Sequence, residues 1–138
     1  MKALAGEEIA DRALSQIGTA FRLHGRTPNV ALDCVGLVAH AIDAENVVMT
    51  YSLKGINLVS ILSYMDSIRL LSPPRSSRIC GRIREGDIAI VACSLQQFHL
   101  MVRAADGWVH SHAALRKVVH TPGGSPWPIV AVRRMIGD

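Results

Sequence analysis

The spacing of apolar residues changes from helical to strand-like along the chain, and this change limits the possible folds more than any other feature. Before a polar, proline-containing connector at residues 72–78, apolar residues recur every three or four positions, as on one face of a helix. After it, β-branched residues alternate in short runs separated by Gly, Asp and Pro turns. Helices followed by a strand meander are typical of an α+β domain, in which helices cover one face of an antiparallel sheet.

The same spacing predicts where the individual elements lie. A first helix carries an apolar stripe from Ile9 to Ile17 and ends at Gly18, a residue type that favours a helix stop. A second helix is expected over residues 34–42 and a third over about residues 57–68. Strands are expected at residues 87–93, 98–103, 108–112, 116–120 and 129–134.

Composition indicates one globular domain over residues 1–138, with 49% hydrophobic and only 19% charged residues. Three cysteines are too few, and odd in number, for a disulfide framework, so at least one thiol is expected to be free. The net charge of +4 is spread without long basic runs, and few aromatic side chains are available for base stacking, so nucleic-acid binding is not expected. Neither a signal peptide nor a membrane span is visible, which predicts a cytoplasmic location.

Cys34 is the cysteine whose position favours reactivity. Asp33 before it is a favoured N-cap residue, so Cys34 is expected at a helix N-terminus. The free amides and the dipole of a helix start stabilise a thiolate, although the Asp33 carboxylate opposes this unless it turns toward the backbone as a cap. The structural alternative is that Cys34 is a small apolar residue on a buried helix face.

Histidines on the later strands are candidates for the base that a nucleophilic cysteine needs. Alternation puts Leu100 on the core face of its strand and His99 on the other face. If residues 104–107 form the loop to the next strand, His112 lies directly opposite His99, and His110 lies diagonally opposite at roughly 7 to 8 Å. Either could orient the His99 ring, as the third member of a nucleophile, base and orienter set. The alternative for His99 is a solvated polar residue on an exposed strand.

A metal site is the competing interpretation of the same residue types. His110, His112 and His120 with a cysteine could bind zinc, but the tight ligand pairs typical of zinc sites do not occur. We therefore expect neither a metal nor another cofactor. Cys80 and Cys93 are expected to be structural, and a disulfide between them stays open.

Several segments together resemble the NlpC-type cysteine peptidases, papain-like hydrolases of bacterial cell walls, and especially their compact phage-associated members. The likeness covers most of the chain. The segment 32–38 is similar to the Asp-Cys-Ser-Gly-Leu nucleophile motif of the family, and Gly86-Asp87 is similar to the Gly-Asp that opens its central strand. The other segments that carry the resemblance are the amino-terminal helix, Phe21-Arg22-Leu23-His24-Gly25, His99-Leu100-Met101-Val102 and Trp108-Val109-His110.

The resemblance implies a papain-like α+β fold and a hydrolase in which Cys34 is the nucleophile, His99 the general base and His110 the third polar residue. The strand-pairing argument slightly favours His112 for the third position. The implied substrate is the stem peptide of peptidoglycan, typically cut between γ-D-glutamate and a diamino acid. Phage tail proteins are implied as partners, which would place the protein on a virion or tail, and cytoplasmic recycling of wall peptides is the alternative.

The resemblance also implies substrate contacts just before the nucleophile. Arg22, His24 and Arg26 are placed to meet carboxylates of the stem peptide, and a solvated basic loop is the alternative. Phe21 stands where many members of the family have a tyrosine, and Asp33 adjoins the nucleophile. A phenyl ring donates no hydrogen bond, and Val35 replaces the common serine after the cysteine. These departures favour a second interpretation, a catalytically silent domain that binds the wall or helps to assemble a tail.

Overall fold

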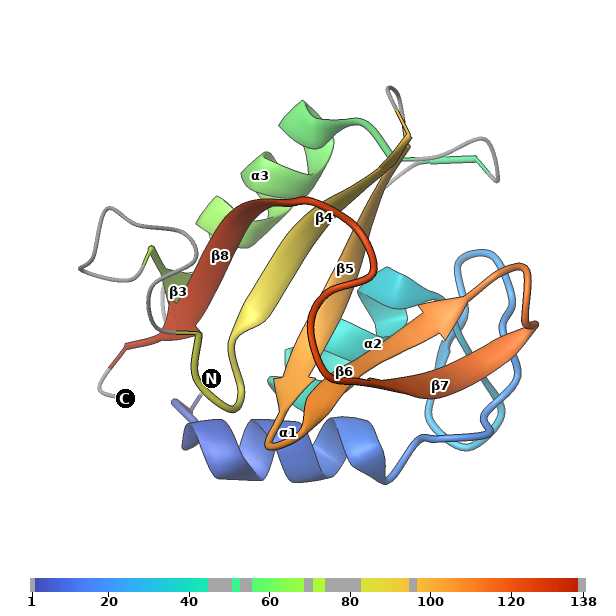
Figure 1. The fold of residues 1–138 in the computed structure, drawn as a ribbon, viewed down its shortest axis with the longest axis horizontal. Helices are drawn as coiled ribbons and strands as arrows, with labels where there is room; N and C mark the ends of the chain where they lie inside the picture. Colours follow the sequence, from blue (N-terminus) through green and yellow to red (C-terminus); the bar gives the residue numbers. More distant parts are fainter. Residues whose placement is uncertain are drawn as a thin grey trace.

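The computed structural model describes residues 2–44, 51–52, 56–68, 71–73, 83–94 and 97–136. Over these ranges the chain forms three helices and eight strands, shown in Figure 1. They are α1 (Gly6–Leu14), β1 (Arg26–Thr27), β2 (Ala31–Leu32), α2 (Cys34–Ala41), α3 (Leu58–Ser67), β3 (Leu71–Ser72), β4 (Ile88–Ser94), β5 (Gln97–Ala104), β6 (Gly107–His112), β7 (Lys117–Pro122) and β8 (Ile129–Met135). The order of helices before the main strands is the one that the sequence predicts.

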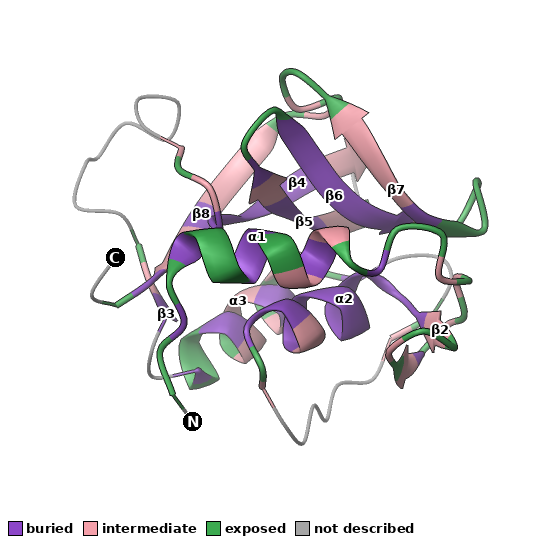
Figure 2. Cartoon of the chain, turned by 90° about the horizontal axis from the view of Figure 1, so that it is seen from below, coloured by how far each residue is buried: buried purple, intermediate pink, exposed green. Residues whose placement is uncertain are grey.

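Six strands form one antiparallel sheet in the order β3-β8-β4-β5-β6-β7, and β1 pairs with β2 in a small hairpin. The helices pack on one face of the sheet, with their buried sides toward it (Figure 2). A smaller apolar cluster of Ala89, Val91, Met101 and Trp108 lies on the other face, where the segment between β7 and β8 crosses the sheet (Figure 1). The predicted α+β class is therefore confirmed, and so are the five longer strands. The two-residue strands β1, β2 and β3 are too short to leave an alternating pattern.

The first helix is shorter than its apolar stripe predicts. It ends at Leu14, and Ile17, expected on the buried side, is 49% exposed in the turn that follows. Gly18 adopts a positive φ of 91°, which only glycine tolerates easily, so the chain leaves the helix direction before this residue. The prediction that the buried stripe extends to Ile17 was wrong.

The second helix begins as predicted, at Cys34. The side chain of Asp33 accepts a hydrogen bond from the amide of Gly36 at 2.8 Å, as an N-cap should. The helix is buried on nearly all sides, and a Cβ added to Gly36 would lie 2.0 Å from the carbonyl oxygen of Gly25. Gly36 therefore allows the helix to approach the backbone just before β1.

The turn between β5 and β6 sets the register of the histidines. Arg103 pairs with Trp108 and Ala104 with Gly107, which is the register that a loop over residues 104–107 predicts. The pairing runs to Val102 and Val109, and beyond it β6 turns away from β5 (Figure 1). The hydroxyl of Ser111, near the end of β6, donates a hydrogen bond of 2.6 Å to the carbonyl of Leu32. This bond ties the end of β6 to the start of α2.

Candidate active site

A cavity of about 280 Å³ lies beside the start of α2, near the point where β5 and β6 separate. It contains the expected nucleophile and base in a lining made mostly of apolar side chains. The lining residues are Phe21, Leu23, Asp33, Cys34, Tyr51, Ser52, Ile56, Cys93, Gln97, Phe98, His99, Ser111, His112, Ala113, Ala114 and Trp127. Segments that are far apart in the sequence thus meet at one concave site.

Cys34 is the first residue of α2, and the residue is 6% exposed. Burial is the largest influence on it and raises its pKa to about 12, and the neighbouring Asp33 carboxylate acts in the same direction. Backbone hydrogen bonds with Leu100 and Val35 and the charge of Arg26 lower the pKa, but by less. The expectation that the helix start lowers the pKa of this thiol left out its desolvation, which acts more strongly in the opposite direction.

His99 and His110 lie in direct contact. Nε2 of His99 is 3.1 Å from Nδ1 of His110, and Nε2 of His110 is 2.9 Å from Oγ1 of Thr121 on β7. Burial lowers the pKa of His99 to about 3 and that of His110 to about 4, with further lowering from neighbouring histidines. Both rings are therefore neutral near pH 7, and the three side chains form one continuous hydrogen-bonded row.

His112 occupies a different position from the one that regular pairing predicts. Because β6 turns away from β5, the ring of His112 lies 6.4 Å from that of His99 between centroids, and its Nδ1 accepts a hydrogen bond from the amide of Ala114 at 3.1 Å. The diagonal neighbour, His110, reaches His99 instead. Of the two alternatives for the third residue, the geometry therefore brings His110 to His99.

Trp127 is a site residue that sequence reasoning missed. Its ring centroid lies 5.6 Å from that of His99 and 5.5 Å from those of His110 and His112, and it stacks on His112 with an interplanar angle of 26°. The residue belongs to the segment between β7 and β8, which no periodicity marks. Only the path of this segment across the sheet brings the indole to the histidines.

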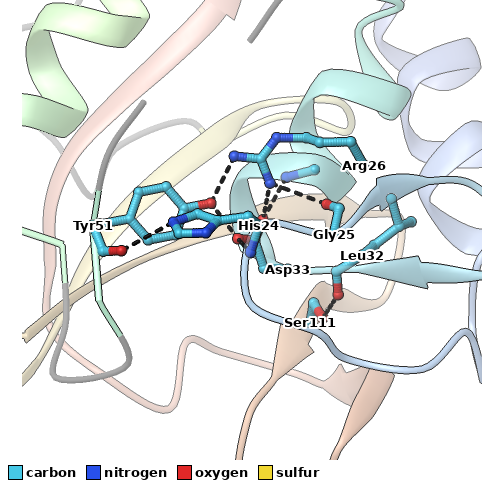
Figure 3. Close-up of polar contacts among 8 residues, drawn as sticks. His24, Gly25, Arg26, Leu32, Asp33, Tyr51 and Ser111 are labelled. Carbon is cyan, nitrogen blue, oxygen red and sulfur yellow. Dashed lines mark hydrogen bonds and ion pairs between the residues drawn. The ribbon is translucent and has the colours of Figure 1, made fainter. Parts of the chain in front are cut away.

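Asp33 is the centre of a second polar cluster beside Cys34, drawn in Figure 3. Its carboxylate is 2% exposed and accepts hydrogen bonds from Arg26 Nη1 at 2.7 Å, from the amide of His24 at 2.9 Å and from the amide of Gly36 at 2.8 Å. The hydroxyl of Tyr51 donates a further hydrogen bond to it. Arg26 Nη2 in turn donates to the Tyr51 hydroxyl at 2.7 Å.

The expected substrate-binding residues separate into two groups. Phe21 and Asp33 line the cavity, whereas Arg22 and His24 are exposed and do not belong to its lining. The His24 ring is instead 2.9 Å from the backbone oxygen of Tyr51. Arg26, also expected to meet substrate, does not line the cavity either and is paired with Asp33. Tyr51 was also missed by sequence reasoning, although it supplies at this cavity a hydroxyl that Phe21 lacks.

The other cysteines and the metal alternative can be followed only where the structure describes them. Cys93 is a free thiol that lines the same cavity, and burial raises its pKa to about 11. Cys80 lies outside the described residues, so its expected structural role and its pairing stay predictions.

Among the described residues no group of three or more His, Cys, Asp or Glu side chains is arranged to hold a metal ion. None of the helices in those residues has the length and apolar character needed to span a membrane.

Comparison with known proteins gives matches by structure alone. No protein-family model matches the chain, and no curated protein matches it in sequence. Two solved structures superpose on 94% of the chain: NlpC1 from Trichomonas vaginalis, with 18% identity and a TM-score of 0.63, and NlpC2 from the same organism, with 16% identity and a TM-score of 0.66. The chain spans 44% and 46% of their lengths. The likeness confirms the predicted NlpC-type, papain-like fold.

Proposed function

We propose that the protein is a cysteine peptidase of the NlpC type, and that residues 1–138 act as one such domain. Cys34 is the nucleophile, His99 the general base and His110 the residue that orients His99. The observation that carries this proposal is the contact of His99 with His110 at a cavity that Cys34 and His99 both line. A nucleophile needs a base, and the base needs a partner that fixes its tautomer.

The hydrogen-bonded row sets the proton positions that this mechanism needs. If His110 donates from Nε2 to Thr121, its Nδ1 is free to accept the Nε2 proton of His99. Nδ1 of His99 is then unprotonated and serves as the base. Because the pKa of Cys34 is raised and that of His99 is lowered, the resting pair is a neutral thiol and a neutral imidazole. The proton therefore moves from the thiol to His99 as the thiol attacks.

The reaction is amide hydrolysis in two steps. The sulfur of Cys34 bonds to the carbonyl carbon, and backbone amides at the start of α2 stabilise the negative charge on the carbonyl oxygen. His99 then protonates the leaving amine as the carbon–nitrogen bond breaks, which leaves an acyl-enzyme. Water then loses a proton to His99 and bonds to the carbonyl carbon of this thioester. The carbon–sulfur bond breaks, the acid product leaves, and the proton returns from His99 to the sulfur.

The proposed substrate is the stem peptide of peptidoglycan, cut between γ-D-glutamate and the diamino acid. The resemblance of segment 32–38 to the nucleophile motif of cell-wall peptidases supports this choice, and the likeness in fold agrees with it. The further likeness to compact phage-associated members supports delivery to the wall by phage tail proteins.

One observation favours a second candidate function. Cys34 is almost fully buried, and its pKa is raised to about 12, which is the condition of an inert structural thiol. A domain that keeps the fold but only binds the wall, or assembles into a tail, would have such a thiol. The two candidates differ in whether peptide bonds are cut.

Digestion of purified peptidoglycan sacculi tests the proposal. We expect the protein to release soluble peptides, and mass spectrometry of the products should show a new free amine on the diamino acid. Binding of the protein to sacculi without any new amine would favour the silent domain. A new amine at another bond would keep the enzyme and correct the substrate bond.

A further inference from the structure

The Asp33 carboxylate directly precedes the proposed nucleophile Cys34 and accepts four hydrogen bonds. One oxygen accepts from the amide of Gly36 and from Arg26, and the other accepts from the amide of His24 and from the hydroxyl of Tyr51. The side chain is 2% exposed. A buried carboxylate next to a thiol opposes ionisation of the thiol unless a cation balances its charge. These donors also leave Asp33 little capacity to accept a hydrogen bond from a substrate.

Arg26 is the cation that meets this carboxylate. It lies on β1, and its pairing with Leu32 on β2 brings it next to Asp33, the following residue in the chain. Nη1 donates to Asp33 at 2.7 Å and to the carbonyl of Gly25 at 3.0 Å, while Nη2 donates to the Tyr51 hydroxyl at 2.7 Å. Only the forked guanidinium reaches these partners at the same time.

We propose that Arg26 is a positioning residue for Cys34: its guanidinium balances the Asp33 carboxylate beside the thiol and, through Tyr51, holds one wall of the cavity at the start of α2. The inference rests on the proposed role of Cys34 as the nucleophile. It explains why a chain that needs an aspartate as helix cap can place a buried carboxylate directly before a reactive cysteine. The cap is kept, and its charge is compensated.

The two charges act on the thiol with opposite signs. Asp33 raises the pKa of Cys34 and Arg26 lowers it. Other titratable groups face the same space, namely Tyr51 on the side of Asp33, and His99, His112 and Cys93 along the cavity lining. The charges of Arg26 and Asp33 also act on the pKa of the Tyr64 hydroxyl. Since all of these stay in place when only Arg26 or Asp33 is changed, the two substitutions should move the reactivity of Cys34 in opposite directions.

Alkylation of Cys34 by iodoacetamide, followed over a range of pH by peptide mass spectrometry, tests this proposal. Because the thiolate is the reacting form, a change of one pKa unit alters the rate about tenfold below the midpoint. We expect Arg26→Gln to slow alkylation about tenfold and Asp33→Asn to accelerate it about tenfold. Asparagine is also a good helix cap, so the start of α2 is kept. Arg26→Lys keeps the charge but cannot donate to Asp33 and Tyr51 at the same time, so its alkylation rate should lie between those of Arg26→Gln and the unchanged protein.

The sign of the two effects separates the proposal from a purely structural role. If Arg26 only held the loop together, both substitutions would loosen the site and change the rate in the same direction, which would overturn the proposal. An unchanged rate in Arg26→Gln would overturn it as well. If circular dichroism shows that Arg26→Gln does not fold, the test passes to Asp33→Asn, in which a rate that is unchanged or lower has the same consequence.

The peptide-release assay and the alkylation assay together distinguish this inference from the proposed function. Failure of the unchanged protein to release peptides from sacculi would remove the peptidase. Opposite shifts in alkylation would still establish that Arg26 and Asp33 control the thiol.

Discussion

His99 and His110 lie 11 residues apart on neighbouring strands, and their ring nitrogens Nε2 and Nδ1 are 3.1 Å from each other. Regular pairing would have placed His112, not His110, across from His99. The separation of β5 and β6 beyond Val102 and Val109 brings the diagonal residue into contact instead. The contact between His99 and His110 therefore depends on where the pairing of β5 and β6 stops, and not only on which residues occupy these positions.

Substitution of His110 should reduce peptide release far more than substitution of His112. His110→Ala removes the partner that fixes the His99 tautomer, and we expect a loss of about a hundredfold, within the range for general acid–base contributions. His112→Ala is the matched control, because its Nδ1 bonds to the amide of Ala114 and not to His99. Because His112 lines the cavity and stacks on Trp127, we expect a loss in its rate, but one of less than about tenfold, below the range for general acid–base contributions. An equal loss in both variants, measured on sacculi, would contradict the role of His110.

Stability should fall as the solution is acidified. The pKa values of His99 and His110 are lowered to about 3 and about 4, whereas the unfolded chain binds these protons near the ordinary value of about 6.5. Above that ordinary value both states are neutral and the full stability is present. Between about pH 6.5 and 4 the unfolded state alone gains protons, so the free energy of unfolding decreases.

Urea unfolding at several pH values measures this decrease. Each histidine changes the free energy of unfolding by at most about 1.4 kcal/mol per pH unit. His99 is only partly buried, so contact with water makes its contribution smaller than this maximum. His110→Gln should make the pH dependence shallower, because it removes one titrating ring and relieves the other. A dependence as steep as that of the unchanged protein would contradict the lowered pKa values.

Gly36 should be intolerant of a side chain. Its Cβ would lie 2.0 Å from the backbone oxygen of Gly25, a contact that no rotamer can relieve. We expect Gly36→Ala to lower the free energy of unfolding by about 3 kcal/mol, the upper part of the range for overpacking. Gly124→Ala is the matched control, because nothing lies within 4 Å of its Cβ position. Thermal melts of the two variants check the difference, and equal melting temperatures would show that α2 does not approach Gly25 so closely.

Local chemistry was sufficient to predict several parts of the site. Asp33 caps α2 because a carboxylate can satisfy free amides within its own turn, whatever surrounds the helix. The face of His99 and the register of the β5–β6 turn follow from alternation and from the length of one loop. These features depend on neighbours in the sequence, so a single chain reveals them.

Other parts depend on long-range packing that no local pattern records. Tyr51 and Trp127 come from segments without periodicity and meet the site only through the path of the folded chain. The raised pKa of Cys34 follows from its burial, which outweighs the local effect of the helix start. Ile17 matches the apolar stripe but lies beyond the end of α1, where the chain turns toward β7.

The rate at which Cys34→Ala releases soluble peptides from sacculi, compared with the unchanged protein, tests the role of Cys34 as the nucleophile most directly. Alanine removes the sulfur and leaves only a small space, so thermal stability should change little and the fold should persist. We predict that release falls to the background of sacculi without protein. Release at the unchanged rate would contradict the role of Cys34 as the nucleophile and with it the assignment of a cysteine peptidase.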